Sequence, residues 1–171
     1  LFSALNQLRQ ITAIENPRKT LKKALAETED GWGNQLIHRL MLHDITRTEK
    51  FEKAISEAVK NKIVLDIGCG TGILSFLALK HGAKHVYAID SNPKCIAYTR
   101  ALAKHNNYEK KISIACCASF KYKIPQLADV LISELIGDSP LNEDLIDVFT
   151  DAQKRLLKPK AILIPNNLRV Y

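Results

Sequence analysis

Residues 62–90 constrain the fold of this chain more than any other stretch. They read KIVLDIGCGTGILSFLALKHGAKHVYAID. The apolar, partly β-branched run 63–65 predicts a buried parallel strand that ends at Asp66, and 86–89 predicts a second strand that ends at Asp90. Between the strands, three apolar residues share one face of a helix: Leu74, Leu77 and Ala78. The stretch therefore predicts a β-α-β unit with an acid at the end of each strand.

The turn after the first strand carries three glycines at alternate positions: Gly68, Gly70 and Gly72. A dinucleotide fingerprint, G-x-G-x-x-G/A, would need a small residue where Ile73 stands. A carboxylate beside the loop, here Asp66, repels phosphate but suits a cationic ligand. Asp90, twenty-four residues later, can accept hydrogen bonds from both hydroxyls of a ribose. The pattern predicts S-adenosylmethionine, and the alternative is a glycine turn without a ligand. It resembles motif I of the class I S-adenosylmethionine-dependent methyltransferases.

The composition narrows the class of protein. A length of 171 residues predicts one domain with a small extension, and the formal charge of +7 fits either a solvated basic surface or an acidic partner such as RNA. The lysines are dispersed, which favours the solvated surface. No apolar run is long enough to cross a bilayer and no signal-peptide layout is present, so we expect a soluble, intracellular, cytoplasmic protein. The chain begins with Leu, which suggests a fragment.

The four cysteines form no C-x-x-C pair and have no histidine at zinc spacing, so no metal site is predicted: Cys69, Cys95, Cys116 and Cys117.

The rest of the chain alternates helices and strands. Residues 1–30 predict an N-terminal helical extension, and 31–171 predict the main domain. Residues 34–59 predict a helix, interrupted near 44–46, that can fold over a ligand. Further helices are expected at 93–106, capped by Asn92, and at 140–157, capped by Ser139; further strands are expected at 112–116, 130–133 and 161–164. This order predicts an α/β, Rossmann-like fold, with a mostly parallel sheet flanked by helices.

The segment that begins at the end of the fourth predicted strand, SELIGDSPLNE (133–143), indicates the kind of substrate. It is not an N-P-P-Y or D-P-P-Y motif, so methylation of a nucleobase loses support. Glu134 and Glu143, nine residues apart, can converge on one cation, and a guanidinium fits because its planar donors pair bidentately with carboxylates. Glu143 has a simpler alternative role, because an acid in the first turn of a helix stabilises the helix terminus.

SELIGDSPLNE resembles the double-glutamate loop of the protein arginine methyltransferases. Residues 41–44, MLHD, with Arg47 and Phe51, resemble the helix that closes over the cofactor in that family. The resemblance covers residues 32–171 and implies the catalytic Rossmann-like domain. The family continues into a C-terminal β-barrel that carries its dimerisation arm. We therefore expect this chain to lack the barrel, and the full-length protein to form a homodimer.

The resemblance also implies which residues hold the cofactor. The methionine part would be lined by Asp66, Gly68, Cys69 and Gly70. Its carboxylate would pair with Arg47, and two further residues of the closing helix would touch the cofactor: His38 and Met41.

The remaining implied contacts lie at later strand ends. Asp90 would hold the ribose, with Ser91 beside it. Ala118 and Ser119 would lie at the adenine edge, although Ser119 stands where many family members have an acid. The substrate guanidinium would be gripped by two catalytic residues: Glu134 and Glu143.

The predicted function is therefore methyl transfer from S-adenosylmethionine to a guanidinium nitrogen of arginine in a protein or peptide, with S-adenosylhomocysteine as product. The step needs alignment of nucleophile, methyl carbon and sulfur, and no metal or covalent intermediate. Two alternatives stay open. One is a methyltransferase acting on another protein side chain or a small molecule. The other is a non-catalytic domain of the same fold that serves as an interaction or RNA-binding module.

Overall fold

The structure is a computed structural model that describes residues 35–136 and 144–169. The chain divides into two compact units, residues 1–50 and 51–171, which are described separately. In the first unit, α3 spans Gln35–His43, and α4, Ile45–Ala58, begins there and ends in the second unit. The predicted interruption is Asp44, whose Oδ1 accepts a hydrogen bond from the Arg47 amide at 2.9 Å. Asp44 thus caps α4, as an aspartate before a helix commonly does.

The second unit contains a five-stranded sheet of order β3-β2-β1-β4-β5, and every neighbouring pair is parallel. The strands are β1 (Ile63–Ile67), β2 (His85–Asp90), β3 (Ile112–Cys116), β4 (Ala128–Ser133) and β5 (Leu157–Ile164). All five residues of β1 are buried, as expected for a central strand covered on both faces. The predicted Rossmann-like fold is confirmed.

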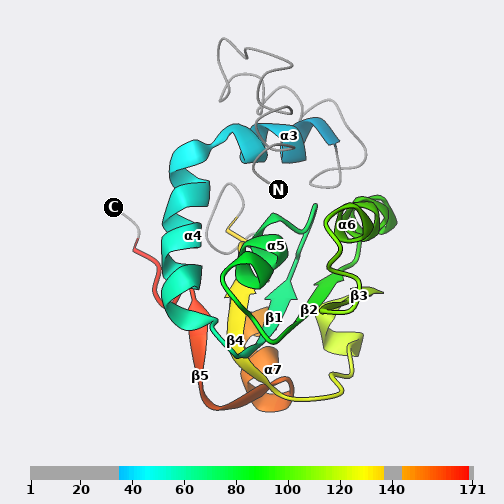
Figure 1. Ribbon diagram of the computed structural model, residues 1–171. Helices are drawn as coiled ribbons and strands as arrows, with labels where there is room; N and C mark the ends of the chain where they lie inside the picture. Colours follow the sequence, from blue (N-terminus) through cyan, green and yellow to red (C-terminus); the bar gives the residue numbers. More distant parts are fainter. Residues whose placement is uncertain (1–34, 137–143, 170–171) are drawn as a thin grey trace. The chain divides into compact units, whose positions relative to one another are not determined.

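Helices cover both faces of the sheet. Helix α5 (Ile73–Lys80) packs on β1 and β2, and α6 (Pro93–His105) packs on β2 and β3. Helix α7 (Leu145–Arg155) contacts β5 and the short 3-10 helix η2 (Ser119–Lys121). Figure 1 shows α5 in front of the sheet and α7 behind it. The carboxyl ends of β1, β2, β3 and β4 therefore meet at one edge, between the two helical layers.

The alternation of side chains in β1 explains both layers. Ile63, Leu65 and Ile67 point to the α7 face, where they share a core with Val148, Ala152 and Leu156. The alternate residue Asp66 points to the other face, where the Ser75 hydroxyl of α5 donates a hydrogen bond to it. One strand thus contributes apolar packing to one face and a carboxylate to the other.

Two predicted elements differ from the structure by more than two residues at one end. The helix predicted over 140–157 is described from Leu145 to Arg155, after Asp144 in a left-handed conformation (φ 52°); Ser139 and residues 140–143 lie outside the described residues. The strand predicted over 161–164 was too short, because β5 begins at Leu157. The sequence misled here because Pro159 looked like a breaker. Pro159 lies in an irregular part of the edge strand β5, where the pairing with β4 passes from Leu157 directly to Ile162. Proline is tolerated at such a position.

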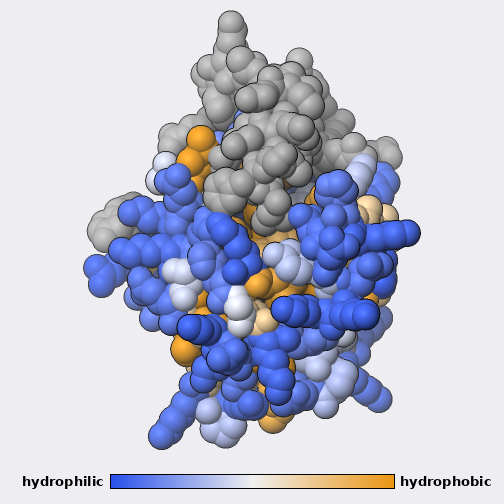
Figure 2. All heavy atoms as spheres, viewed as in Figure 1, coloured by the Kyte–Doolittle hydropathy of each residue, from blue (hydrophilic) through white to orange (hydrophobic). Residues whose placement is uncertain are grey.

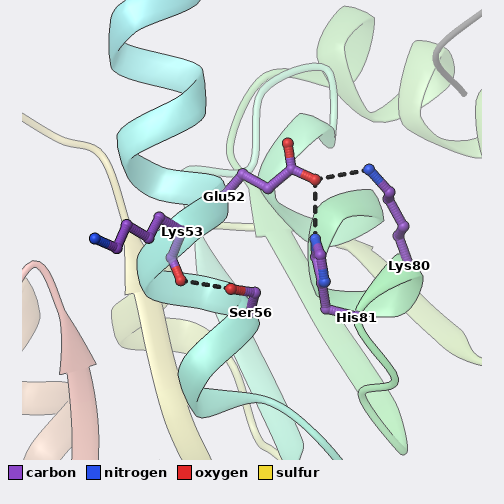
Figure 3. Close-up of polar contacts among 5 residues, drawn as sticks. All are labelled: Glu52, Lys53, Ser56, Lys80 and His81. Carbon is purple, nitrogen blue, oxygen red and sulfur yellow. Dashed lines mark hydrogen bonds and ion pairs between the residues drawn. The ribbon is translucent and has the colours of Figure 1, made fainter.

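Glu52 links the part of α4 that belongs to the second unit to α5 (Figure 3). Glu52 Oε1 lies 2.7 Å from Lys80 Nζ and 2.9 Å from His81 Nε2. The hydrogen bond from Lys80 lowers the pKa of Glu52, and partial burial opposes this. Ser56 donates to the Lys53 carbonyl one turn away. Glu52 therefore links α4 to the C-terminal end of α5.

Figure 2 shows hydrophilic side chains spread over most of the coloured surface in this view, with apolar atoms between them. Within the described residues, no helix has the length and apolar content needed to cross a membrane.

Candidate cofactor site

The turn after β1 folds back over the end of β2. The amides of Gly68 and Cys69 donate to the Ile89 carbonyl at 2.9 and 3.0 Å. The Gly72 amide donates to the Cys69 carbonyl at 2.7 Å, and α5 begins at the next residue. Burial raises the pKa of the Cys69 thiol, so this group stays neutral. The glycine turn is therefore a compact, neutral loop at the carboxyl edge of the sheet.

Asp90, the last residue of β2, is bonded directly to this turn. Its Oδ2 accepts from the Gly70 amide and its Oδ1 accepts from the Asn92 amide, both at 2.8 Å. Each carboxylate oxygen has a second lone pair, so both can still accept from a ligand hydroxyl. The side chain is partly exposed and its orientation is fixed from two sides. Asp90 can therefore hold a pair of ribose hydroxyls.

Asp66 lies beneath the same turn, with an exposed fraction of 1%. Ser75 Oγ donates to its Oδ2 at 2.6 Å, while Oδ1 is buried without a hydrogen-bond partner in the described part of the chain. Burial raises the pKa of Asp66 to about 7; the Ser75 hydrogen bond opposes the shift and the charge of Asp90 adds to it. A buried carboxylate with an unpaired oxygen is stabilised by a nearby cation, which fits a ligand with ammonium and sulfonium groups.

The end of β4 meets the start of the glycine turn. Ser133 is fully buried, and its hydroxyl donates to the Ile67 carbonyl at 2.8 Å. A Cβ built on Gly68 would lie 2.6 Å from Leu135 Cδ2, and Gly68 has a φ of +69°, so only glycine suits this position. Glu134 lies between these two contacts and is partly exposed. Because both of its neighbours contact residues 67–68, the backbone at Glu134 passes the start of the glycine turn. Glu143 lies outside the described residues.

The predicted adenine edge lies at the end of β3. Cys116 pairs with Asp90 in the sheet, and its Sγ lies 3.7 Å from the carbonyl oxygen of Ser91. The next residues lead to Ala118, which is exposed, and Ser119, which is buried and begins η2. The ends of β2 and β3 therefore bring Ser91, Ala118 and Ser119 to the same edge as Asp90.

Three predicted cofactor residues belong to the first unit. His38 and Met41 lie in α3 and Arg47 lies in α4, and all three are partly exposed. Arg47 Nη2 donates to the Met41 carbonyl at 3.0 Å, so these two residues are held together. Their contact with a cofactor bound to the second unit stays a prediction.

Ser75 and Leu135 were not predicted from the sequence. The signal for Ser75 was a single polar residue inside the apolar run ILSFLAL (73–79), which is unusual unless it has a buried partner. Leu135 gave no signal, because its contact with Gly68 depends on the path of the chain after β4.

Among residues 35–136 and 144–169, no group of three or more His, Cys, Asp or Glu side chains is placed to hold a metal ion.

The sequence of this chain is similar to that of a known family. A family model described as "Ribosomal protein L11 methyltransferase (PrmA)" matches residues 45–166, which is most of the chain. The chain belongs to this methyltransferase family. The match includes the glycine turn, Asp90 and Glu134, and it confirms the resemblance to class I methyltransferases noted in the sequence.

Similar proteins carry a more specific name. Protein arginine N-methyltransferase 1 of Saccharomyces cerevisiae is 34% identical over 168 residues, covering 94% of this chain and 48% of that protein. Probable protein arginine N-methyltransferase 6 of Arabidopsis thaliana is 33% identical over 138 residues, covering 79% and 32%. The chain thus spans about half or less of the length of these curated relatives.

Two solved structures of protein arginine methyltransferases are also similar to this chain. The Trypanosoma brucei PRMT1 enzyme-prozyme heterotetrameric complex with AdoHcy matches with a TM-score of 0.74 and 32% identity, covering 79% of this chain and 43% of that one. Arabidopsis thaliana protein arginine methyltransferase 10 matches with a TM-score of 0.73 and 29% identity, covering 78% and 39%.

Proposed function

We propose that this chain binds S-adenosylmethionine and forms the cofactor-binding half of a protein arginine N-methyltransferase. The observation that carries the proposal is the place of Glu134 in the fold: it is a partly exposed acid that directly follows β4, at the sheet edge where the glycine turn and Asp90 also lie. Relatives named for arginine methylation, including the yeast protein, support the guanidinium as acceptor. The structure of the T. brucei relative in complex with AdoHcy supports the cofactor.

Each residue of the edge has a defined task in this proposal. Asp90 accepts hydrogen bonds from the ribose hydroxyls, and Asp66 supplies negative charge beneath the turn that faces the cationic end of the cofactor. When bound, S-adenosylmethionine supplies a methyl group on a sulfonium, which is a good leaving group. Further contacts come from the other predicted cofactor residues: His38, Met41, Arg47, Gly68, Cys69, Gly70, Ser91, Ala118 and Ser119.

Glu134, with Glu143, accepts hydrogen bonds from the substrate guanidinium. Hydrogen bonds to charged groups contribute about 1.5–3 kcal/mol each, and a bidentate carboxylate pair also fixes the plane of the guanidinium. The two acids thereby hold one guanidinium nitrogen in the direction of the reacting methyl group. As the new N–C bond forms, the C–S bond would break with its electron pair left on sulfur, and the nitrogen would release one proton. They also stabilise the positive charge of the methylated product.

A second candidate acceptor follows from the family model, which is named for a ribosomal protein. Under this alternative the same cofactor edge serves methylation of another protein side chain or terminus, and Glu134 binds an amine instead of a guanidinium. Both candidates act on protein. RNA binding has no support from the relatives reported above, which are named for protein substrates.

We propose that residues 1–30 form an extension to a domain over 31–171, and that the full-length protein is dimeric. All four cysteines are free thiols, and free thiols are typical of the reducing cytoplasm. This supports a cytoplasmic location.

The test uses the 171-residue chain in two steps. Calorimetric titration with S-adenosylhomocysteine should show binding that Asp90→Ala abolishes and Glu134→Gln leaves in place. Methyl transfer from radiolabelled S-adenosylmethionine is then measured on two peptides that differ only in arginine or lysine at one position. Labelling of the arginine peptide that Glu134→Gln abolishes supports the proposal, whereas labelling of the lysine peptide supports the second candidate. A chain that binds no S-adenosylhomocysteine would refute the cofactor assignment.

A further inference from the structure

We propose that Thr99 of α6 is a positioning residue for the glycine turn, an inference that rests on the proposed cofactor binding. Thr99 has an exposed fraction of 0%. Its Oγ1 lies 3.0 Å from the Cys95 carbonyl, one helical turn earlier, and 2.8 Å from the Gly70 carbonyl, twenty-nine residues away. The first contact is common for a threonine inside a helix. The second is not required by the helix and links α6 to the turn.

Gly70 is therefore held on both sides. Its N–H donates to Asp90 Oδ2 at 2.8 Å, and its carbonyl accepts from the Thr99 hydroxyl. With a φ of +53°, Gly70 uses a conformation that glycine adopts easily and leaves easily. The two hydrogen bonds select one orientation for the two peptide groups that flank it. Thr99 thereby fixes the turn in the position that also orients the ribose acid.

The two branches of the Thr99 side chain act at different points. A Cβ built on Gly72 would lie 2.7 Å from Thr99 Cγ2, so the methyl group packs against the end of the turn. The hydroxyl bonds to Gly70 instead. Thr99→Val keeps the branched shape and removes the donor, whereas Thr99→Ser keeps the donor and removes the methyl group. The pair separates packing from hydrogen bonding.

The experiment titrates the 171-residue chain and both variants with S-adenosylhomocysteine and records the thermal melt of each without ligand. We expect Thr99→Val to raise Kd about tenfold, which corresponds to about 1.4 kcal/mol. Thr99→Ser should bind within about threefold of the unsubstituted chain, because it retains the hydrogen bond. Both variants should melt at lower temperature. A purely structural role would instead make affinity follow melting temperature in both.

Three results would overturn the inference. An unchanged Kd for Thr99→Val would show that the hydroxyl does not position the turn. An equal loss of affinity in Thr99→Val and Thr99→Ser would show that packing alone matters. Absence of binding by the unsubstituted chain would overturn the proposed cofactor site together with the role of Thr99. The first two results would overturn only the role of Thr99. If Thr99→Val does not fold, Thr99→Ala compared with Thr99→Ser gives the same contrast, because alanine also lacks the donor.

Discussion

Replacing Asp66 by asparagine should stabilise the chain at alkaline pH while weakening cofactor binding. The pKa of Asp66 is raised from 3.8 to about 7 in the folded chain. Between these values the folded state holds a proton that the unfolded state has released, so stability falls as pH rises through this window and is level above it. One pKa unit corresponds to about 1.4 kcal/mol, so ionisation of Asp66 costs about 4 kcal/mol over the window.

Asparagine avoids this cost because it is neutral at every pH. Its carbonyl oxygen can still accept from Ser75 Oγ, as Oδ2 of Asp66 does. Its amide nitrogen would then occupy the position of the unpaired Oδ1, and an unsatisfied buried donor costs about 1–3 kcal/mol. The net gain above pH 7 is about 1–3 kcal/mol, and each kcal/mol raises Tm by about 2–4 °C in a domain of this size.

The assay is urea unfolding followed by circular dichroism at pH 5 and pH 8.5. The unsubstituted chain should lose stability between the two pH values relative to Asp66→Asn. The other ionisable groups are the same in both proteins and cancel in the comparison. A smaller Kd for S-adenosylhomocysteine in Asp66→Asn would contradict the proposed role of the charge.

Asp129→Asn is the matched control. Burial raises the pKa of Asp129, but the hydrogen bonds from Lys158 Nζ and the Ile63 amide outweigh it and leave the pKa below its ordinary value. Asp129 therefore stabilises the fold when ionised, and its loss should destabilise the chain at both pH values.

If the stability of the unsubstituted chain and that of Asp66→Asn changed with pH in parallel, the raised pKa assigned to Asp66 would be refuted.

Two further substitutions probe contacts around the site. Glu52→Gln should lower the free energy of unfolding by about 0.5–1 kcal/mol, because it removes the ion pair with Lys80 and weakens the hydrogen bond with His81, and the loss should shrink at high salt in urea titrations. An equal loss at all salt concentrations would contradict this. Arg155→Ala removes donors to two carbonyls of the η2 segment, one of them on Ser119, so amide exchange in that segment should accelerate while β1 is unaffected. Unchanged exchange there would contradict the assignment.

The predicted β-α-β unit and the position of Asp90 follow from patterns within thirty residues of sequence. Strand burial, a glycine-rich turn and helix periodicity are each local, and parallel strands bring their carboxyl ends to one edge. The contacts from Ser75 to Asp66 and from Thr99 to Gly70 could not be predicted in the same way. They depend on the rotation of a helix about its axis and on its distance from the turn, which the packed core decides.

The hydrogen bonds of the turn also decide which kind of nucleotide suits this edge. A phosphate binds to backbone N–H groups that point out of a glycine-rich loop. Here the N–H groups of Gly68 and Cys69 donate hydrogen bonds to the Ile89 carbonyl. The N–H of Gly70 donates to the Asp90 carboxylate, and the N–H of Gly72 donates to the Cys69 carbonyl. These four donors are used inside the protein, and two carboxylates lie beside them. The edge therefore offers acceptors for hydroxyl groups and negative charge for a cation, which opposes a pyrophosphate and suits a nucleoside with a cationic amino-acid arm.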